Sequence, residues 1–562
     1  MDIVTMNIMY STMVSICREM GVTLMKTSYS TIFNEALDFT CGLADSEGRL
    51  IACAEFCPAQ IGSIETLIHN CVEEFPKETM RSGDIILHND VFRGGLHIPE
   101  HTVFKPIFID GELIAYAIAI GHLAEIGGKS AGGFSGDSTD VFQEGLRVPP
   151  VKIVKEGKDD VDLWKMYLAN VRTPRFNYGD VKALISSVDL GESRVMDLVN
   201  KYGKDVFLST SEDLLDYTEK RMRAEIEEIK DGVYEFEDYI EDDGNTDHRY
   251  TIKVKLYVKG SDIIADFTGS SNQAPGPINC TYTVALAATY NTLLHITDQT
   301  IPKNNGAFRP VKVIAPASTI VNVEYPGPSV GGNTEGHPRL ASTLFGAFSK
   351  ACPEKVMASE GGTHTNFVFG CYHPDYDEYV ACYDLESNGW GGRVDADGND
   401  MVDAINGNCR SCPVEVFETR FPWIIEKWAL TPDSGGAGKF RGGLGGTKYL
   451  KALTEINCSQ VSDRHQFAAY GLFGGQKGGL SGTFIQKSGT QDWGTTKTLY
   501  GRPSSSKFSG VVLEKGDRVK MLFPGGGGYG NPKDRNRDFV KKDLDEGFIT
   551  EMAAKEIYGL DY

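Results

Sequence analysis

The order of apolar and polar positions predicts a chain that opens with a helix and continues as paired strands. Residues 3–25 place apolar side chains at helical spacing, which is typical of an amphipathic helix. Residues 38–45 and 50–54 alternate as strands do, around a turn at Ser46-Glu47-Gly48, and residues 61–75 return to helical spacing. The start of the chain is therefore expected to combine helices with a strand hairpin.

The strongest hairpin signal in the chain is Asp110-Gly111. It separates two apolar stretches, residues 103–109 and 113–120, and an Asp-Gly pair favours the tight turn that joins antiparallel strands. Because a hairpin brings its two ends together, residues just before the first strand and just after the second are expected to be neighbours in space.

The pattern changes near residue 232. Residues 180–231 are predicted to be helical and charged, and shorter strands follow, with helices at residues 283–294 and 338–352. After residue 430 the chain is rich in glycine, which favours short strands joined by tight turns, and a charged helix and tail end it at residues 533–562. Further strands are predicted at residues 84–89, 233–239, 249–258, 263–268, 311–314 and 320–323, and the glycine clusters lie at residues 435–446, 471–482 and 524–530.

These elements predict a multi-domain α+β fold, rich in mixed or antiparallel sheets with scattered helices. We predict an N-terminal domain over residues 1–230, which carries the candidate metal site described below. A central α+β domain is expected over residues 231–425, and a glycine-rich β region with a terminal helix over residues 426–562.

Composition narrows the class of protein. Apolar residues make up 41% and charged residues 24% of the 562 residues, as in ordinary globular proteins. The formal net charge of −21 disfavours binding to nucleic acid or to anionic lipid. No apolar run reaches the ~20 residues that span a bilayer, and no signal peptide is expected. Twelve cysteines in such a chain are expected to be reduced thiols, so the sequence favours a cytoplasmic enzyme or enzyme subunit.

The chemically most informative residues bracket the predicted Asp110-Gly111 hairpin. His97 and Glu100 precede its first strand, and His122 follows its second strand. Imidazole and carboxylate groups suit a divalent metal, and the hairpin is expected to bring the three together. A pair of ordinary hydrogen-bonded histidines in a β-region explains the same residues equally well, so the spacing leaves both interpretations open.

Other patterns carry less information. Asp38 stands between apolar neighbours, where either a metal or a backbone cap could serve as its partner. Cys409 and Cys412 form a C-x-x-C pair with no second pair at zinc-ribbon distance, which indicates coincidence. Residues 525–530 match G-x-G-x-x-G outside any βαβ context, and a sharp turn is the expected structure there, with an anion-binding nest as the alternative. Residues 327–331 match G-x-S-x-G, but Gly331-Gly332-Asn333 is a poor helix start, so a chance match is expected.

Nine blocks of residues, taken together and in order, resemble the hydantoinase B/5-oxoprolinase family. Its members are β-type subunits of ATP-dependent hydantoinases, lactamases and oxoprolinases, and related subunits of acetone- and acetophenone-type carboxylases. The resemblance runs almost from end to end of the chain. The blocks lie at residues 35–40, 94–100, 121–128, 170–172, 301–310, 332–335, 408–415, 463–464 and 524–530.

The resemblance implies a metal site at Asp38, His97, Glu100 and His122, holding one divalent ion such as Zn, Mn or Fe. It also implies a partner subunit of the hydantoinase A type, which binds ATP and phosphorylates the substrate. This agrees with the lack of a Walker motif in the present chain. Glu100 departs from the family's usual Asp, and Leu123 and Glu125 replace its usual His and Asp, so the ligand geometry or the metal can differ.

The activity implied is hydrolysis of a cyclic amide, of the hydantoin, lactam or oxoproline type, after ATP-dependent activation. A metal at the four residues would activate water, Glu125 would act as an acid or base or else be a solvated turn residue, and Asn333 and Glu335 would line the substrate pocket. His337 and His364 are either further pocket residues or plain surface histidines. An ATP-dependent carboxylase subunit is the alternative, although such subunits are longer than this chain, and a non-catalytic scaffold held by its metal is a second alternative.

Overall fold

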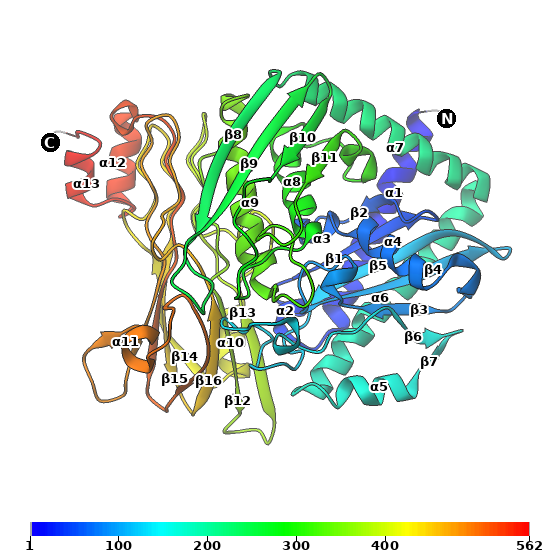
Figure 1. Cartoon of the computed structure of the whole chain (residues 1–562), viewed down its shortest axis with the longest axis horizontal. Helices are drawn as coiled ribbons and strands as arrows, with labels where there is room; N and C mark the ends of the chain where they lie inside the picture. The colour runs from blue at the N-terminus through cyan, green and yellow to red at the C-terminus, as the bar shows by residue number, and fades with distance from the viewer. Residues whose placement is uncertain (1–2, 561–562) are drawn as a thin grey trace.

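The structure is a computed structural model and describes residues 3–560, so the last two residues of the predicted C-terminal tail lie outside the described range. Four β-sheets lie along the longest axis of the molecule, with the N-terminal sheet to the right and the C-terminal helices to the left in Figure 1. The helices are α1 (Ile3–Thr27), α2 (Thr31–Asn34), α3 (Pro58–Ile61), α4 (Ile64–Glu74), α5 (Val161–Leu168), α6 (Pro174–Tyr202), α7 (Lys204–Glu227), α8 (Tyr282–Ile296), α9 (His337–Phe348), α10 (Val414–Arg420), α11 (Thr496–Tyr500), α12 (Arg537–Asp545) and α13 (Glu551–Glu556).

The first sheet has seven antiparallel strands in the order β2-β1-β5-β4-β3-β6-β7. Its strand β5 is apolar at nearly every position because both faces are covered. Ala115, Ala117 and Ala119 pack in the cluster with α1 and α6, while Tyr116 and Ile118 pack in the cluster with α4. The strands are β1 (Phe39–Asp45), β2 (Leu50–Cys53), β3 (Ile85–His88), β4 (Glu100–Ile109), β5 (Glu112–His122), β6 (Val151–Lys155) and β7 (Lys158–Asp159).

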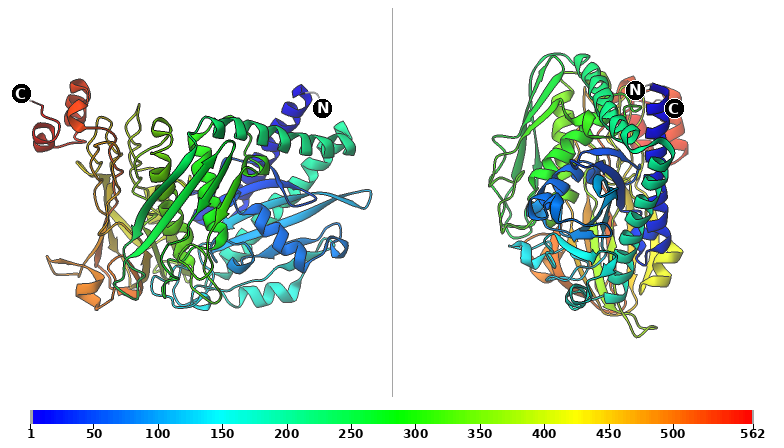
Figure 2. Two further views of the ribbon diagram at one scale, coloured as in Figure 1. Left: turned by 45° about the horizontal axis from the view of Figure 1, so that its top comes forward. Right: turned by 90° about the vertical axis from the view of Figure 1, so that its right-hand side faces the viewer.

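The second sheet, β11-β10-β9-β8, covers α8 and α9 with one face, and the two views in Figure 2 show these helices beneath it. Strand β9 alternates between buried and half-buried positions, which is the pattern of a sheet with one face on the core. Only its β10–β11 pair is parallel. The strands are β8 (Gly232–Ile240), β9 (Tyr250–Lys259), β10 (Asp262–Asp266) and β11 (Val311–Ile314).

The third and fourth sheets pack face to face around one apolar cluster. Their orders are β13-β12-β16-β19 and β14-β15-β20-β17-β18, and all pairs are antiparallel. The third sheet crosses residue 425, because β12 pairs with β16. The strands are β12 (Asn366–Tyr372), β13 (Tyr379–Asp384), β14 (Trp423–Leu430), β15 (Gly446–Ala452), β16 (Ile456–Val461), β17 (Gly482–Gln486), β18 (Trp493–Gly494), β19 (Lys507–Leu513) and β20 (Arg518–Leu522).

The glycine clusters fit the prediction of tight turns at Phe473-Gly474, where φ is +52° and +97°, but most of their residues differ from it. They run as extended segments packed directly against one another, with backbone amides donating across the contacts, as from Gly436 to Gly526 at 2.8 Å. A Cβ on Gly525 would lie 1.8 Å from the carbonyl oxygen of Ser434. Close approach of backbone to backbone, rather than turn conformation, therefore requires glycine here.

The predicted α+β class is confirmed, as is the hairpin at Asp110-Gly111, where both residues have positive φ. The strand predicted at residues 320–323 is wrong, because this stretch forms a turn with isolated bridges at Thr319 and Asn322. Residues 180–231 form parts of two helices separated by Gly203 at φ +91°.

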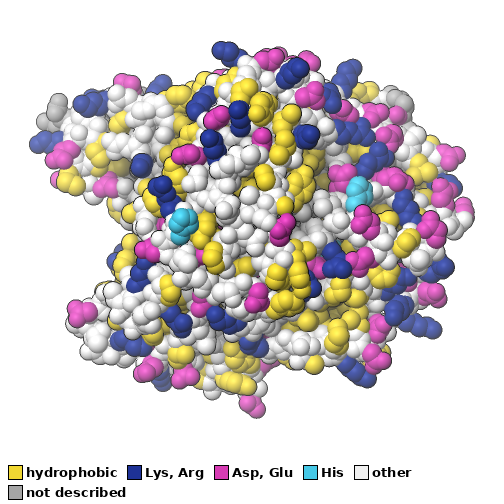
Figure 3. All heavy atoms as spheres, viewed as in Figure 1, with side chains coloured by type: hydrophobic (Ala, Val, Ile, Leu, Met, Phe, Trp, Pro, Cys, Tyr) yellow, Lys and Arg dark blue, Asp and Glu magenta, His cyan; other side chains and the backbone are white. Residues whose placement is uncertain are grey.

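Acidic and basic side chains are interspersed on the face shown in Figure 3. Within residues 3–560, none of the helices combines the length and the apolar character needed to cross a bilayer.

Candidate functional site

The first sheet brings the predicted metal-site residues together. Glu100 opens β4 and is the register partner of His122, which ends β5. The amide of His122 donates to the carbonyl of Asp38 at 3.1 Å, because Asp38 directly precedes β1, the other neighbour of β5. The rings of His97 and His122 have centroids 5.0 Å apart. The predicted proximity across the hairpin is thus confirmed, and all four side chains are buried.

Gln60 links the two carboxylates of this group, although no pattern in the sequence pointed to it. Its Nε2 donates to Glu100 Oε1 at 3.1 Å and to Asp38 Oδ1 at 3.4 Å. The short helix α3 carries Gln60 into the interior, where the residue is fully buried. The amide therefore holds the two acids toward one point.

His97 is held so that one ring nitrogen faces the acids. Its Nδ1 lies 3.1 Å from the carbonyl oxygen of Val330, which leaves Nε2 3.6 Å from Glu100 Oε1. The Val330 segment is itself held by Glu144, which accepts from the amides of Ser329 and Val330 at 2.9–3.0 Å. A histidine whose second nitrogen is bound to a backbone carbonyl has the orientation usual for a metal ligand.

His122 is oriented by stacking instead of hydrogen bonding. Its ring lies on that of Tyr383 with centroids 4.1 Å apart, and Phe134 stacks against both. Neither ring nitrogen of His122 has a hydrogen-bond partner among residues 3–560, although both atoms are buried. Burial lowers the pKa of His122 well below its usual value, so the ring is neutral. A neutral imidazole with free nitrogens is able to coordinate a cation.

The group carries acids without protein cations. Burial and the neighbouring Glu100 raise the pKa of Asp38 to about 7. No lysine or arginine of the described chain forms an ion pair with Asp38 or Glu100. No three His, Cys, Asp or Glu side chains within residues 3–560 are arranged with the geometry of a formed metal site. The residues are gathered, and their role as ligands stays a prediction.

Glu125 follows this group in the chain, three residues after His122, and is buried. Its exposed fraction is 1%, so the solvated turn residue is wrong. Both carboxylate oxygens are engaged: Arg172 Nη1 donates to Oε1 at 2.7 Å, and the Arg172 amide donates to Oε2 at 2.6 Å. The amide of Gly127 adds a third bond at 2.8 Å. A carboxylate bound in this way anchors the Gly127-Gly128 turn, and the acid–base role stays untested.

Asn333 and Glu335 lie on a π-helical turn, Gly332–Gly336, directly before α9. Such turns are frequent at functional sites. Asn333 Nδ2 lies 3.4 Å from Glu100 Oε1, while its Oδ1 is buried and has no hydrogen-bond partner within residues 3–560. Glu335 accepts from Asn366, which accepts in turn from the Tyr383 hydroxyl at 2.7 Å. Burial raises the pKa of Glu335 to about 8. Asn333 thus reaches the acids directly, and Glu335 is connected to the His122 stack.

His337 and His364 are buried, so their interpretation as surface histidines is wrong. His364 Nδ1 lies 3.0 Å from Asp403 Oδ1, and its Nε2 lies 3.0 Å from Asn406 Oδ1. Burial alone would lower the pKa of His364, but Asp403 outweighs it and raises the pKa to about 9. Asn406 donates to the carbonyl of Asn333, so this pair is linked to the candidate site.

The remaining motifs take part in packing. The amides of Gly526, Gly527 and Gly528 donate to backbone carbonyls, so they do not form an anion nest, and residues 524–529 contain no turn. A helical turn does follow Ser329, contrary to expectation, but its hydroxyl has no hydrogen-bond partner in the described chain. All twelve cysteines are free thiols, Cys409 and Cys412 included.

Comparison with known proteins agrees with this architecture. The family model described as hydantoinase B/oxoprolinase matches residues 2–532. The chain is 31% identical to the putative D-/L-hydantoinase subunit of a Pseudomonas species, over 100% of this chain and 95% of that protein. It is 30% identical to the caprolactamase β subunit of Pseudomonas jessenii, over 100% and 96%.

Two solved structures share the fold. The crystal structure of ATP-dependent caprolactamase from Pseudomonas jessenii superposes with a TM-score of 0.92 at 28% identity, over 100% of this chain and 97% of that chain. A nucleotide-free acetone carboxylase superposes with a TM-score of 0.90 at 19% identity, over 99% and 79%. The chain belongs to the hydantoinase B/oxoprolinase family.

Proposed function

We propose that this chain is the metal-holding subunit of a two-component, ATP-dependent amidohydrolase that opens a cyclic amide. The relatives named as a hydantoinase subunit and a caprolactamase support the reaction class. The observation that carries the proposal is the pair His97 and His122. Neither ring nitrogen of His122 has a hydrogen-bond partner within residues 3–560, and His97 Nε2 faces Glu100 Oε1 at 3.6 Å, in a buried space that also contains Asp38.

The donor set fits a divalent cation. Two imidazoles and two carboxylates offer mixed nitrogen and oxygen ligands, which suit Zn, Mn or Fe. His122 has two orphaned nitrogens, and the acids lack protein cations. When bound, the metal would supply a Lewis acid that polarises a substrate oxygen and activates water.

The chain's own residues would prepare this site and bind the substrate. Gln60 would keep Asp38 and Glu100 convergent, and Val330 would fix the tautomer of His97. The Oδ1 of Asn333 would accept a hydrogen bond from the protonated ring nitrogen of the activated substrate beside Glu100. The Tyr383 and Phe134 rings would exclude water from one side of His122.

Ring opening needs an activated amide, because resonance makes the amide carbonyl a poor electrophile. We assign this step to an ATP-binding partner of the hydantoinase A type, which would phosphorylate the amide oxygen. Two relatives, the hydantoinase and the caprolactamase chains, are each named as one subunit of their enzyme, which supports an assembly with a second subunit. The present chain has no Walker motif.

An ATP-dependent carboxylase subunit remains the second candidate, since the acetone carboxylase chain has the same fold. The present chain covers 79% of that chain but 97% of the caprolactamase chain, which favours the amidohydrolase. Chemistry separates the two directly. With the partner, ATP and a hydantoin, lactam or oxoproline substrate, the amidohydrolase forms a ring-opened acid without consuming bicarbonate. Bicarbonate-dependent product would reject the proposal in favour of the carboxylase.

The metal site itself is tested by elemental analysis of the purified chain. We expect a stoichiometric divalent metal in wild type and its loss in His97→Ala and in His122→Ala. His101→Gln is the matched control, because this neighbouring buried histidine is held by Tyr167 and the carbonyl of Pro99. Metal retained in both alanine variants, or lost equally in the control, would contradict the assignment. A bound metal without any reaction would favour the scaffold alternative.

A further inference from the structure

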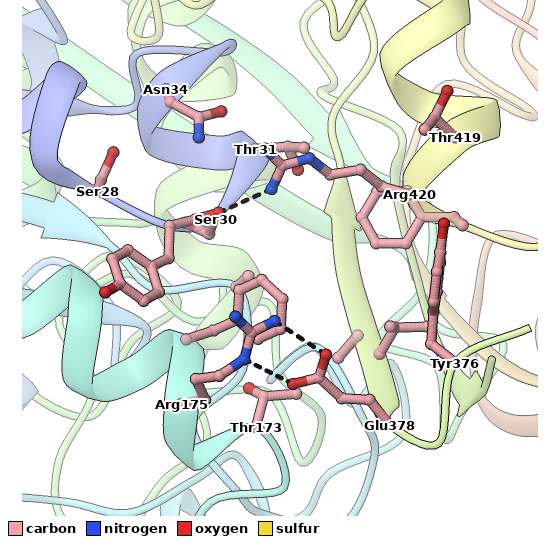
Figure 4. A pocket seen from close by; sticks show the side chains of 16 residues that line it. Ser28, Ser30, Thr31, Asn34, Thr173, Arg175, Tyr376, Glu378, Thr419 and Arg420 are labelled. Atoms are coloured by element: carbon pink, nitrogen blue, oxygen red, sulfur yellow. Dashed lines mark hydrogen bonds and ion pairs between the residues drawn. The ribbon is translucent and has the colours of Figure 1, made fainter.

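A cavity of about 620 Å³ lies next to the candidate site without including its predicted ligands. Five separate segments form it: residues 28–34, Ala124, the start of α6, residues 376–381 and the end of α10. Figure 4 shows polar side chains from these segments pointing into one space. The volume lies within the range of small-molecule sites.

The cavity adjoins the His122 stack through two chain segments. Ala381 lines it and lies on β13 two residues before Tyr383, on the same face of that strand. Ala124 also lines it, two residues beyond His122. The wall residues Ala124 and Ala381 therefore lie two residues along the chain from the ring pair of His122 and Tyr383, whose centroids are 4.1 Å apart.

Positive charge dominates the cavity although the whole chain carries −21. Arg175 and Arg420 both line it, and Glu378 is its one acidic side chain. Arg175 binds Glu378 with two bonds of 2.9 Å, so these two charges compensate each other. Arg420 donates from Nη1 to the carbonyl of Tyr29 at 2.8 Å, and its other nitrogens have no hydrogen-bond partner in the described chain. One guanidinium is therefore free to bind an anion.

Two further features favour an anion with an apolar body. The N-terminal end of the long helix α6 opens onto the cavity at Thr173, with no acidic residue in its first turn. Phe176, Val380 and Phe421 supply apolar surface beside these groups.

We propose that this cavity is a binding site for a small organic carboxylate with an apolar chain. Its carboxylate lies against Arg420 and the start of α6, and its chain lies against Phe176 and Phe421. The ring-opened acid of the proposed function belongs to this class of ligand. If the proposed function holds, the cavity therefore receives the product from the buried site. The binding claim itself holds without a metal.

The test is isothermal titration of the full-length chain with hexanoate. We expect hexanoate to bind wild type saturably. The uncharged hexanamide should bind at least about tenfold more weakly, because it lacks the charge-assisted hydrogen bond that the carboxylate makes. Arg420→Gln should weaken hexanoate about tenfold, and Ala381→Trp should abolish binding by filling the cavity. Glu378→Gln should tighten it, because Arg175 then becomes free. Arg194→Gln, whose arginine pairs with Glu19 outside the cavity, is the matched control and should bind as wild type does.

Titration of the His97→Ala/His122→Ala double variant separates this site from the metal. Hexanoate binding that persists there belongs to the cavity, even if the amidohydrolase proposal fails. Binding lost in the double variant but kept in Arg420→Gln and Ala381→Trp would overturn the cavity assignment. Equal affinity for hexanoate and hexanamide would overturn it as well. If Arg420→Gln fails to fold, the opposite shifts in Glu378→Gln and Ala381→Trp still decide the outcome.

Discussion

Two buried clusters of charged and polar side chains in this molecule differ in whether protein cations offset the cost of burying their carboxylates. The ion-pair cluster, Asp238, Arg339, Asp463, Arg464 and Lys507, contains its own cations. Arg339 Nη2 lies 2.8 Å from Asp463 Oδ2, and Arg464 Nη2 lies 3.2 Å from Asp238 Oδ2. The site cluster, Asp38, His97, Glu100 and His122, contains two acids and two imidazoles, and no lysine or arginine of the described chain pairs with its acids.

The contrast is visible in the direction in which each cluster shifts the pKa of its carboxyl groups. Burial would raise the pKa of Asp463, but Lys507 and Arg339 outweigh it, and the pKa falls below its usual value. Burial and Glu100 raise the pKa of Asp38 to about 7, and the opposing charges of His97 and His364 do not cancel this rise. The first cluster pairs its charges within the protein, so loss of one partner is costly, whereas the second has no protein cation for the proposed metal to compete with.

The largest expected effect is at the ion-pair cluster. Arg339→Met should lower the free energy of unfolding by about 3–5 kcal/mol, because it leaves Asp463 and Asp238 buried without a main partner. Urea unfolding followed by circular dichroism measures this. Arg194→Met, at a half-exposed pair with Glu19, should change stability by about 0.5 kcal/mol or less. Equal losses in the two variants would contradict the comparison.

An intermediate effect is expected at the His364–Asp403 pair. The folded-state pKa of His364 is raised from 6.5 to about 9, so the pair stabilises the fold fully below pH 6.5. This contribution is lost as pH rises through about 9. Urea unfolding across this window should show a decline of about 1.5–3 kcal/mol in wild type. Asp403→Asn should be less stable at low pH and should lack most of the decline, whereas a parallel decline in the variant would reject the pair as its source.

The smallest expected change in stability is at the site cluster, and it is a gain where the other two variants show a loss. In chelator-treated protein, Asp38→Asn should raise the free energy of unfolding by about 1 kcal/mol, because it removes an uncompensated charge. Asp180→Asn is the matched control and should be destabilising, since Asp180 accepts from the amides of Tyr29 and Ser30. Addition of Zn or Mn should make wild type more stable to unfolding than Asp38→Asn, the reverse of the metal-free order. If metal-free Asp38→Asn is less stable than metal-free wild type, the Asp38 carboxylate is compensated within the protein, as the acids of the ion-pair cluster are, and the contrast between the clusters fails.

The sequence pattern predicted the fold correctly where the structure depends on residues close together in the chain. The Asp110-Gly111 turn and the apolar strands beside it are correct, because a tight turn and two-sided burial depend on neighbouring residues. The pairing of Glu100 with His122 followed from that turn alone. The prediction failed at residues 320–323 and at the glycine clusters, where the structure depends on segments distant in sequence.

What the sequence by itself determined is the set of chemical groups and their order: the four candidate ligands, the hairpin between them and the family. Only the tertiary structure decided which neighbours they have. Gln60 reaches both acids from α3, Tyr383 covers His122 from β13, and Arg172 binds Glu125 from the segment before α6. The physical reason is that a buried polar group is defined by partners from several elements at once, and spacing along one chain carries no record of which elements fold against each other.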